Sequence, residues 1–571
     1  MLKIPFAIPL VSVRFRMIDL LILVFVASVL SLVVYIASGW RYEMQPALEI
    51  DLSPASIPMY SANSLVRIFI AYMLSLVFSI WYGYTANRNK LNEKIMIPLL
   101  DVLQSIPVLS FLPGVVLAMI ALFPNRRLGL ELASILLIFT GQVWNMAFSY
   151  YNSINTMPRE LIEVTKIFRH TRFTRFLRLD IPFSTIGLVW NSMMSVAGGW
   201  FFLMACEMFV LKDRDFRLPG LGSYIQTAAN KGDMEHVLYG IGTMVLLIVV
   251  LDIILWRPVV AWSQKFRFDT VQAEEEKEST VLDIIRKSPF VMYIGRTFSG
   301  VIGKIETFYS RMDTLPDVKI IKVLQKVIAL VILAGAISLL GWSLIKGGRL
   351  LSGLSPDNYL SVVEAAFYSV LRTTVAIVIA SLWTVPLGVY IGLNPRVSKV
   401  LQPIVQVVAS IPATAVFPVV LLFLIKLGGG LTIGSVFLML LGTQWYILFN
   451  VIAGASAIPQ DLREVTRLYG IQGWRKWKVL ILPGIFPYLV TGLITATGGA
   501  WNASIVSEYV SFGGAVMKTK GLGSLISEAT VSGNFGLLLL STLCMALIVV
   551  SINRLLWKRL FALAQEKYRL E

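Results

Sequence analysis

Long apolar stretches alternate with short polar connections along the 571-residue chain. Most of these stretches have about 20 residues or more, the length that an α-helix needs to cross the hydrocarbon core of a bilayer. They lack the regular ten-residue alternation of a membrane β-barrel. The pattern predicts an all-α integral membrane protein with about twelve transmembrane helices, at 17–38, 61–86, 94–122, 128–151, 183–210, 234–260, 321–346, 362–393, 399–426, 430–451, 484–511 and 534–561.

Many residues of the first half recur in the second half 301 positions later. Upstream of one loop, at 123–127 in the first half, the spacing is 305 instead, as an insertion between matched flanks would produce. A repeat this long indicates two copies of one domain rather than a solenoid. We therefore expect homologous six-helix domains at 1–262 and 321–571, joined by a cytoplasmic linker at 263–320.

Composition and charge support a membrane protein. Hydrophobic residues make up 56% of the chain and charged residues 15%, whereas about a quarter of a soluble domain is charged. The net charge of +17 comes mainly from Lys and Arg on alternate connections, such as 88–94, 159–178 and 257–267. Basic residues concentrate on cytoplasmic loops, so this distribution places both chain ends in the cytoplasm and does not indicate nucleic-acid binding. Amphipathic stretches in the linker are compatible with helices on the membrane surface.

The sequence offers no means of building a metal, nucleotide or disulfide site. His170 and His236 are the only histidines, and Cys206 and Cys544 lie at positions that are not equivalent between the repeats. No phosphate-binding G-x-x-x-x-G-K-[ST] loop occurs. We expect no cofactor and no catalytic residue on this chain, and if ATP powers it, another subunit binds the ATP.

A repeated cytoplasmic segment follows the fourth predicted span of each half. In the second half, Pro459 suits a first helical turn, Asp461 and Glu464 suit the positive end of a helix, and Gly470 suits a left-handed helix end. A basic and aromatic stretch follows and ends at Leu482–Pro483. The pattern predicts a short helix followed by a glycine turn.

This segment resembles the EAA motif of ABC importer permeases. The matching residues are Glu464, Val465, Thr466, Gly470, Leu482 and Pro483, with Val–Thr in place of the usual Ala–Ala. The resemblance implies a coupling helix that docks into a cleft on a nucleotide-binding subunit. We refer to 158–169 and 459–470 as the coupling segments.

The first coupling segment departs from the motif. Glu163, Val164, Thr165 and Pro182 match their counterparts, but Arg169 occupies the position of Gly470. A left-handed conformation costs a non-glycine residue about 1–2 kcal/mol. We therefore expect the two coupling segments to differ in shape and in affinity for their partners, and it stays open whether those partners are identical.

Further repeated motifs resemble the nitrate, sulfonate, taurine and bicarbonate group of these permeases. They are Ser–Ile–Pro at 105–107 and 410–412, a Gly–Trp or Ala–Trp step upstream of a glutamate, and Gly–Leu–Gly at 220–222 and 521–523. The resemblance implies import of a small solute, an oxyanion or organosulfonate, by alternating access in the plasma (inner) membrane of a prokaryote. It also implies two ATPase subunits that carry ATP and Mg at the cytoplasmic face, an external binding protein, and a single fused permease chain per transporter.

Polar residues inside the predicted spans are candidates for the translocation path, because such residues are costly in lipid. Arg67 and Arg372 could attract an anion, or each could pair with the glutamate of its own repeat and hold helices together, which is the interpretation we favour. The remaining candidates lie on or just after the fifth spans, and for the tryptophans an interfacial anchor is the alternative; these residues are Asn191, Trp200, Glu207, Trp501, Asn502 and Glu508.

Pro107 and Pro412 interrupt the third predicted span of each half, where an interior proline costs about 3 kcal/mol.

Two other classes of protein remain as alternatives. A secondary transporter also carries a duplicated bundle, but it has no use for paired docking loops. The other alternative is an ABC permease for another substrate class, for export, or without a transport path.

Overall fold

A computed structural model of the protein describes residues 17–40, 48–124, 127–211, 214–266, 280–286, 288–313, 319–426 and 430–567. By its internal contacts the chain divides into two compact units. The first unit takes the described parts of 1–39, 149–193 and 250–330, and the second takes those of 40–148, 194–249 and 331–571. The domain boundaries at 262 and 320 stay predictions.

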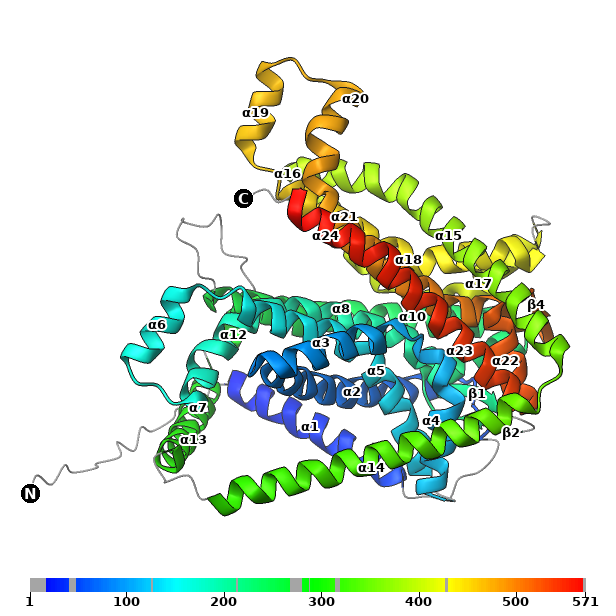
Figure 1. The fold of residues 1–571 in the computed structure, drawn as a ribbon, viewed down its shortest axis with the longest axis horizontal. Helices are drawn as coiled ribbons and strands as arrows, with labels where there is room; N and C mark the ends of the chain where they lie inside the picture. Colours follow the sequence, from blue (N-terminus) through cyan, green and yellow to red (C-terminus); the bar gives the residue numbers. More distant parts are fainter. Residues whose placement is uncertain are drawn as a thin grey trace, which may run out of the picture. The chain divides into compact units, whose positions relative to one another are not determined.

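The described residues are almost entirely helical (Figure 1). The elements up to the linker are α1 Met17–Gly39, η1 Pro54–Ser56, α2 Ile57–Ala86, α3 Lys90–Ser105, η2 Val108–Phe111, α4 Leu112–Leu122, α5 Arg127–Asn155, α6 Arg159–Ile167, α7 Arg172–Arg175, η3 Phe176–Asp180, α8 Ile181–Glu207, β1 Met208–Leu211, β2 Arg214–Arg217, α9 Leu221–Asn230, α10 Met234–Leu251, η4 Asp252–Trp256, α11 Arg257–Ser263 and η5 Gln264–Phe266.

The linker and the second repeat continue the same series of elements. They are α12 Thr280–Arg286, α13 Pro289–Asp313, α14 Lys319–Ser352, α15 Pro356–Leu393, α16 Pro395–Ser410, α17 Ala413–Lys426, α18 Gly430–Ser456, α19 Gln460–Leu468, α20 Gly473–Lys476, η6 Trp477–Ile481, α21 Leu482–Ser507, β3 Tyr509–Phe512, β4 Ala515–Lys518, α22 Leu522–Ser532, α23 Phe535–Ile552, η7 Asn553–Trp557 and α24 Lys558–Lys567.

The described residues include eight helices that are long and apolar enough to cross a membrane, or up to ten if each of two bent helix pairs counts as one span. An all-α membrane protein is therefore confirmed, and the count of twelve spans stays a prediction. In its described part, the expected linker contains the 3₁₀ turn η5, the helices α12 and α13, and the first residues of α14. Their placement on a membrane surface also stays a prediction, and 267–279 and 314–318 lie outside the described residues.

Each third predicted span is broken at its proline. The helices α3 and α4 meet at 84°, and α16 and α17 meet at 85°. Ile106 and Ile411 precede the two prolines and have extended ψ angles of 123° and 121°. Proline disfavours helical backbone in the residue before it, which explains why both helices stop at this point.

The described part of each repeat contains two π-helical turns and one β-hairpin that the hydropathy pattern does not predict. The π-helical turns η3 and η6 precede the fifth spans, and η4 and η7 lie within the sixth. The hairpins β1–β2 and β3–β4 are antiparallel and follow the fifth spans. Strands this short carry no recognisable alternation of apolar residues, so hydropathy does not reveal them.

Within the second unit, the helix α18 packs against α15 and α21 (Figure 1). The buried core between these helices contains small and branched residues, including Ala380, Ile447, Val451, Ile485 and Ala496. Glycines permit close approach between these helices. A Cβ atom on Gly492, for example, would lie 3.1 Å from the Cα atom of Ile447.

Reciprocal contacts join the two repeats within the second unit. The Val108 backbone N–H of the first repeat donates to Asn502 Oδ1 of the second at 2.8 Å. In the opposite sense, Thr414 Oγ1 of the second repeat donates to the Phe201 carbonyl oxygen of the first at 3.4 Å. Equivalent segments of the two repeats therefore contact each other within this unit.

Candidate functional site

The second coupling segment has the predicted helix and turn. The helix α19 begins after Pro459, and Gly470 has a left-handed φ of 61°. The Ile471 N–H donates to the Thr466 carbonyl at 2.9 Å, which closes the helix end. Arg463 fastens the helix at its start by donating through Nη2 to the Ile458 carbonyl at 2.7 Å.

The first coupling segment has the same shape, so the expected difference in shape is wrong. The helices α6 and α19 both have nine residues. Arg169 adopts a left-handed φ of 49° and is the only non-glycine residue with a positive φ among the described residues. The His170 N–H donates to the Thr165 carbonyl at 2.9 Å, which is the same closure as in α19. These backbone hydrogen bonds offset the conformational cost of the arginine.

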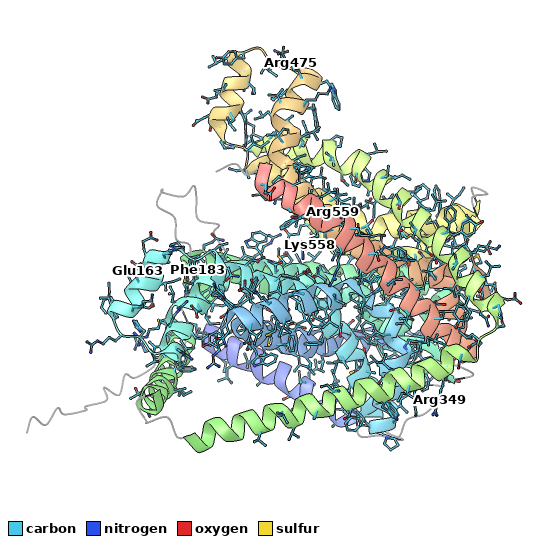
Figure 2. All side chains as sticks on the ribbon, in the orientation of Figure 1. Glu163, Phe183, Arg349, Arg475, Lys558 and Arg559 are labelled. Carbon is cyan, nitrogen blue, oxygen red and sulfur yellow. The ribbon has the colours of Figure 1, made fainter. Side chains whose placement is uncertain are left out.

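Both coupling segments expose apolar side chains at the helix end. Ile167 and Phe168 are 76% and 72% exposed, and Leu468 and Tyr469 are 84% and 80% exposed. The glutamates of the motif are also exposed. Each segment lies at the end of the long helices that flank it; Figure 2 labels Glu163 on α6 in the first segment and Arg475 on α20, which follows the second segment.

The remaining residues of the coupling motif serve the local fold. The Thr165 and Thr466 hydroxyls donate to carbonyls of their own helices at 2.7 Å and 2.8 Å. The prolines Pro182 and Pro483 closely follow the π-helical turns η3 and η6, inside helices that run continuously over 172–207 and 473–507. Val164 and Val465 are 46% and 45% exposed.

In the first repeat, Arg67 of α2 lies in a buried network with two carboxylates. It donates to both oxygens of Glu131 at 2.5 Å and 2.9 Å, and through Nη1 to Glu207 Oε1 at 2.6 Å. Arg127 adds a second cation 3.3 Å from Glu131. The four charged groups therefore balance, as buried charges must to be tolerated.

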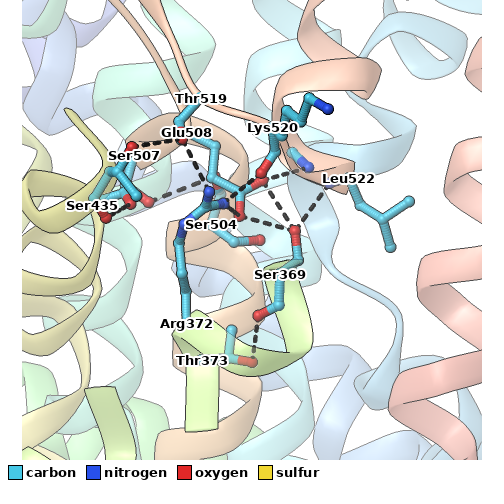
Figure 3. A network of polar contacts seen from close by, with 12 residues as sticks. Ser369, Arg372, Thr373, Ser435, Ser504, Ser507, Glu508, Thr519, Lys520 and Leu522 are labelled. Atoms are coloured by element: carbon cyan, nitrogen blue, oxygen red, sulfur yellow. Dashed lines mark hydrogen bonds and ion pairs between the residues drawn. The ribbon is translucent and has the colours of Figure 1, made fainter. Parts of the chain in front are cut away.

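In the second repeat, Arg372 of α15 occupies the equivalent position (Figure 3). It donates through Nη1 to Glu508 Oε1 at 3.0 Å and to the Lys520 carbonyl at 2.6 Å, and through Nη2 to Thr519 Oγ1 at 2.9 Å. Thr432 stands where the first repeat has its second carboxylate, and its hydroxyl lies 3.3 Å from that of Thr519. This network therefore contains one cation and one anion.

The same glutamates explain the Gly–Leu–Gly motif. Glu207 Oε2 accepts the Gly222 N–H at 2.7 Å, and Glu508 Oε2 accepts the Gly523 N–H at 2.8 Å, so each carboxylate caps the start of α9 or α22. A Cβ atom on Gly220 or Gly521 would overlap the carboxylate of its own repeat. The repeated glycines are thus required by the close approach of a buried glutamate.

The two arginines are therefore paired with the glutamates of their own repeats, as we favoured. Each network joins the second span, the fifth span and the helix that follows the hairpin. Its hydrogen bonds are directed inward, and both glutamate side chains are fully buried. Such a network can hold helices in register, but it does not present an unpaired cation to a solute.

The other candidates for the translocation path differ in their burial and in their hydrogen-bond partners. Trp200 and Trp501 are buried, so they are not interfacial anchors in this fold. Asn191 and Asn502 both donate to carbonyls of their own helices, and Asn502 also accepts the Val108 N–H of the other repeat. Whether any of them contacts solute stays a prediction.

Gln142 of α5 is a polar residue that the sequence analysis did not select. It is fully buried, and within the described part of the chain neither atom of its amide group has a hydrogen-bond partner. A Cβ atom on Gly199 of α8 would overlap this amide. In the second repeat Thr443 occupies the position and donates to the Met439 carbonyl at 2.9 Å. An alignment of the two repeats could have indicated this residue, because it pairs the large amide side chain of Gln142 with the small hydroxyl side chain of Thr443.

Among the described residues, no group of three or more His, Cys, Asp or Glu side chains could hold a metal ion. The buried carboxylates instead accept hydrogen bonds from arginines, serines and backbone N–H groups.

Comparison with known proteins gives a match in each half of the chain. A family described as "Binding-protein-dependent transport system inner membrane component" matches residues 75–256 and 384–557. The nitrate import permease protein NrtB of Synechocystis sp. is 31% identical over 196 residues, which are 34% of this chain and 66% of that protein.

Two further relatives have different stated substrates. The bicarbonate transport system permease protein CmpB of Synechococcus elongatus is 29% identical over 145 residues, or 25% of this chain and 51% of that protein. The taurine transport system permease protein TauC of Escherichia coli is 26% identical over 183 residues, or 32% of this chain and 63% of that protein. The matches thus span between 51% and 66% of the length of these three relatives.

Proposed function

Because this chain belongs to the family of binding-protein-dependent transport system inner membrane components, we propose that it is the membrane-spanning permease of an ATP-driven importer for a small anion. The family match covers both repeats, so one chain carries two permease domains. The chain is a multi-pass inner-membrane protein rather than an enzyme. In our proposal it converts closure of attached ATPase subunits into a change in which side of the membrane the solute path faces.

The observation that carries this proposal is the pair of coupling segments. Each is a short helix that ends in a left-handed turn and exposes apolar side chains, Ile167 and Phe168 in one and Leu468 and Tyr469 in the other. Exposed apolar side chains on a polar helix favour contact with a protein surface. We assign them to two ATPase subunits, which would bind ATP and Mg at the cytoplasmic face.

The buried networks have a mechanical role in this proposal. Arg67 and Arg372 join the second span of each repeat to the fifth span and to the helix after the hairpin. Because a buried ion pair loses several kcal/mol when one partner is removed, these elements would move together. Each repeat would therefore rock as a unit, and the reciprocal contacts between the repeats would rearrange.

The solute that we propose is a small oxyanion or organosulfonate. The relatives named above are permeases for nitrate, bicarbonate and taurine. An external binding protein would deliver the solute to a single permease chain per transporter. Both chain ends would lie in the cytoplasm of a prokaryote, in agreement with the basic residues on alternate connections.

Transport by the isolated complex tests this function. The full chain would be affinity-purified with its attached subunits, reconstituted into vesicles, and supplied with an external binding protein from the same genome. We expect uptake of labelled nitrate, bicarbonate or taurine that requires ATP. Absence of any co-purifying ATPase, or uptake that proceeds equally well without ATP, would overturn the proposal.

Variants of the second coupling segment test the assignment of residues. Glu464→Ala and Gly470→Val would reduce uptake while leaving the chain in the membrane, because the first loses a docking contact and the second cannot keep the left-handed turn. Asp461→Asn is the matched control on the same helix. Wild-type uptake in both of the first two variants would contradict the assignment.

A further inference from the structure

We infer that both coupling segments bind the same protein, so that the transporter contains two copies of one ATPase polypeptide rather than two different ATPases. This inference rests on the proposed function and specifies its partner. Arg169 in place of Gly470 raised the opposite expectation, because it makes the first segment a weaker match to the family motif. In the structure, Arg169 and Gly470 form the same left-handed turn.

The two coupling segments have equivalent backbones. The helices α6 and α19 have equal length, begin after equivalent prolines, and end in the same turn. The N–H of Arg169 donates to the Lys166 carbonyl at 3.0 Å, and the N–H of Gly470 donates to the Arg467 carbonyl at 3.1 Å. A cleft that fits one backbone therefore fits the other.

The two coupling segments also expose similar side chains. The apolar pair is Ile167 and Phe168 in the first segment and Leu468 and Tyr469 in the second, with similar exposure at each position. The exposed glutamate is retained, and the basic residue after it is lysine in one segment and arginine in the other. The apolar pair, the glutamate and this basic residue are therefore matched, whereas the exposed Arg159 and Arg169 of the first segment correspond to Gln460 and Gly470 in the second.

The left-handed turn is kept at Arg169 although the residue is not glycine. A non-glycine residue with a left-handed backbone costs about 1–2 kcal/mol, and such conformations persist where the surroundings require them. The repeats have diverged freely elsewhere, as Glu131 and Thr432 show in the buried networks. The unchanged turn at Arg169 is what a single docking cleft, used twice, would demand.

The two coupling segments are equivalent only up to their left-handed turns. In the second segment Trp474 of α20 is 67% exposed. In the first segment the equivalent helix α7 is contacted by the linker helix α13 within the same compact unit. The equivalence therefore covers 159–169 and 460–470 and does not extend into α7 and α20.

Homogenised chains test the inference directly. One variant would carry the sequence of 460–470 at both positions, and the other would carry the sequence of 159–169 at both. If one ATPase serves both sites, each variant should co-purify with the same single ATPase polypeptide, in an amount within about twofold of that bound by the natural chain, because equal contacts give equal affinity. If two different ATPases are bound, each variant would lose one of them, and uptake would fall more than tenfold.

Native mass spectrometry of the unaltered complex provides a second measurement that does not depend on the folding of a variant. We expect one permease chain with two ATPase subunits of identical mass. Two ATPases of different mass in one complex would overturn the inference while leaving the proposed function intact. If no ATPase were bound at all, the proposed function itself would fail, so the two failures are distinguishable.

Discussion

Arg67 donates a hydrogen bond to Glu207 over 2.6 Å, and both side chains are buried. The glutamate also accepts the Gly222 N–H, so one carboxylate joins α2 to the end of α8 and the start of α9. Arg372 and Glu508 repeat this arrangement in the second half. The pair is therefore a structural joint that the duplication preserved.

Removing one member of this joint should destabilise the protein more than removing both. Glu508→Leu leaves Arg372 without its carboxylate partner, and breaking a buried pair in this way costs about 3–5 kcal/mol. Adding Arg372→Met removes the uncompensated cation and should recover part of the loss. Recovery should be incomplete, because the Gly523 N–H still lacks its acceptor. Thermal unfolding of the purified chain in detergent measures both effects, and additive losses would contradict the prediction.

The second prediction concerns the first glycine of the Gly–Leu–Gly motif. Gly521→Ala should lower the unfolding temperature and reduce the yield of folded protein, because the added Cβ atom overlaps the buried Glu508 carboxylate. Gly498→Ala is the matched control within α21, where a Cβ atom meets no other atom within 4 Å. Alanine is favoured over glycine inside a helix by about 1 kcal/mol, so the control should be neutral or stabilising. Equal stability of the two variants would argue against the overlap.

The third prediction uses the difference between the buried networks. Glu131→Thr introduces the second-repeat residue into the first repeat and leaves Arg67 and Arg127 facing the single carboxylate of Glu207. We expect a loss of about 3–5 kcal/mol, because a buried cation is left uncompensated. The double variant Glu131→Thr/Arg127→Leu restores the balance and should be more stable than the single one. A double-mutant cycle on unfolding free energies measures this coupling, and a double variant that is less stable than the single one would refute it.

The fourth prediction concerns the left-handed turn at Arg169. Arg169→Gly should keep binding of the ATPase and increase stability slightly, because glycine adopts this conformation without steric cost. Arg169→Val should weaken ATPase binding, since a β-branched residue with positive φ costs of order 1–3 kcal/mol. Co-purification of ATPase with each variant gives the readout. Wild-type recovery of ATPase with the valine variant would show that the turn is not needed for docking.

The sequence by itself determined the fold class, the duplication and the coupling motif. Apolar stretches long enough to span a bilayer are a local property, and a spacing of 301 can be read without coordinates. The helix of 460–468, the left-handed Gly470 and the break at each Ser–Ile–Pro also follow from local chemistry. The family match over 75–256 and 384–557 agrees with this interpretation.

Only the tertiary structure decided which polar groups meet. The partners of Arg67 in the first network come from α5 and α8, which are distant in sequence, and the sequence named Glu207 but not Glu131. The role of Gly220 and Gly521 depends on a carboxylate that approaches from another helix, and no local pattern encodes that approach. Likewise, the backbone hydrogen bonds at the end of α6 outweigh the intrinsic preference of Arg169. Intrinsic preferences of about 1–2 kcal/mol are small enough for such contacts to override, so the equivalence of the two coupling segments could not be predicted from the sequence.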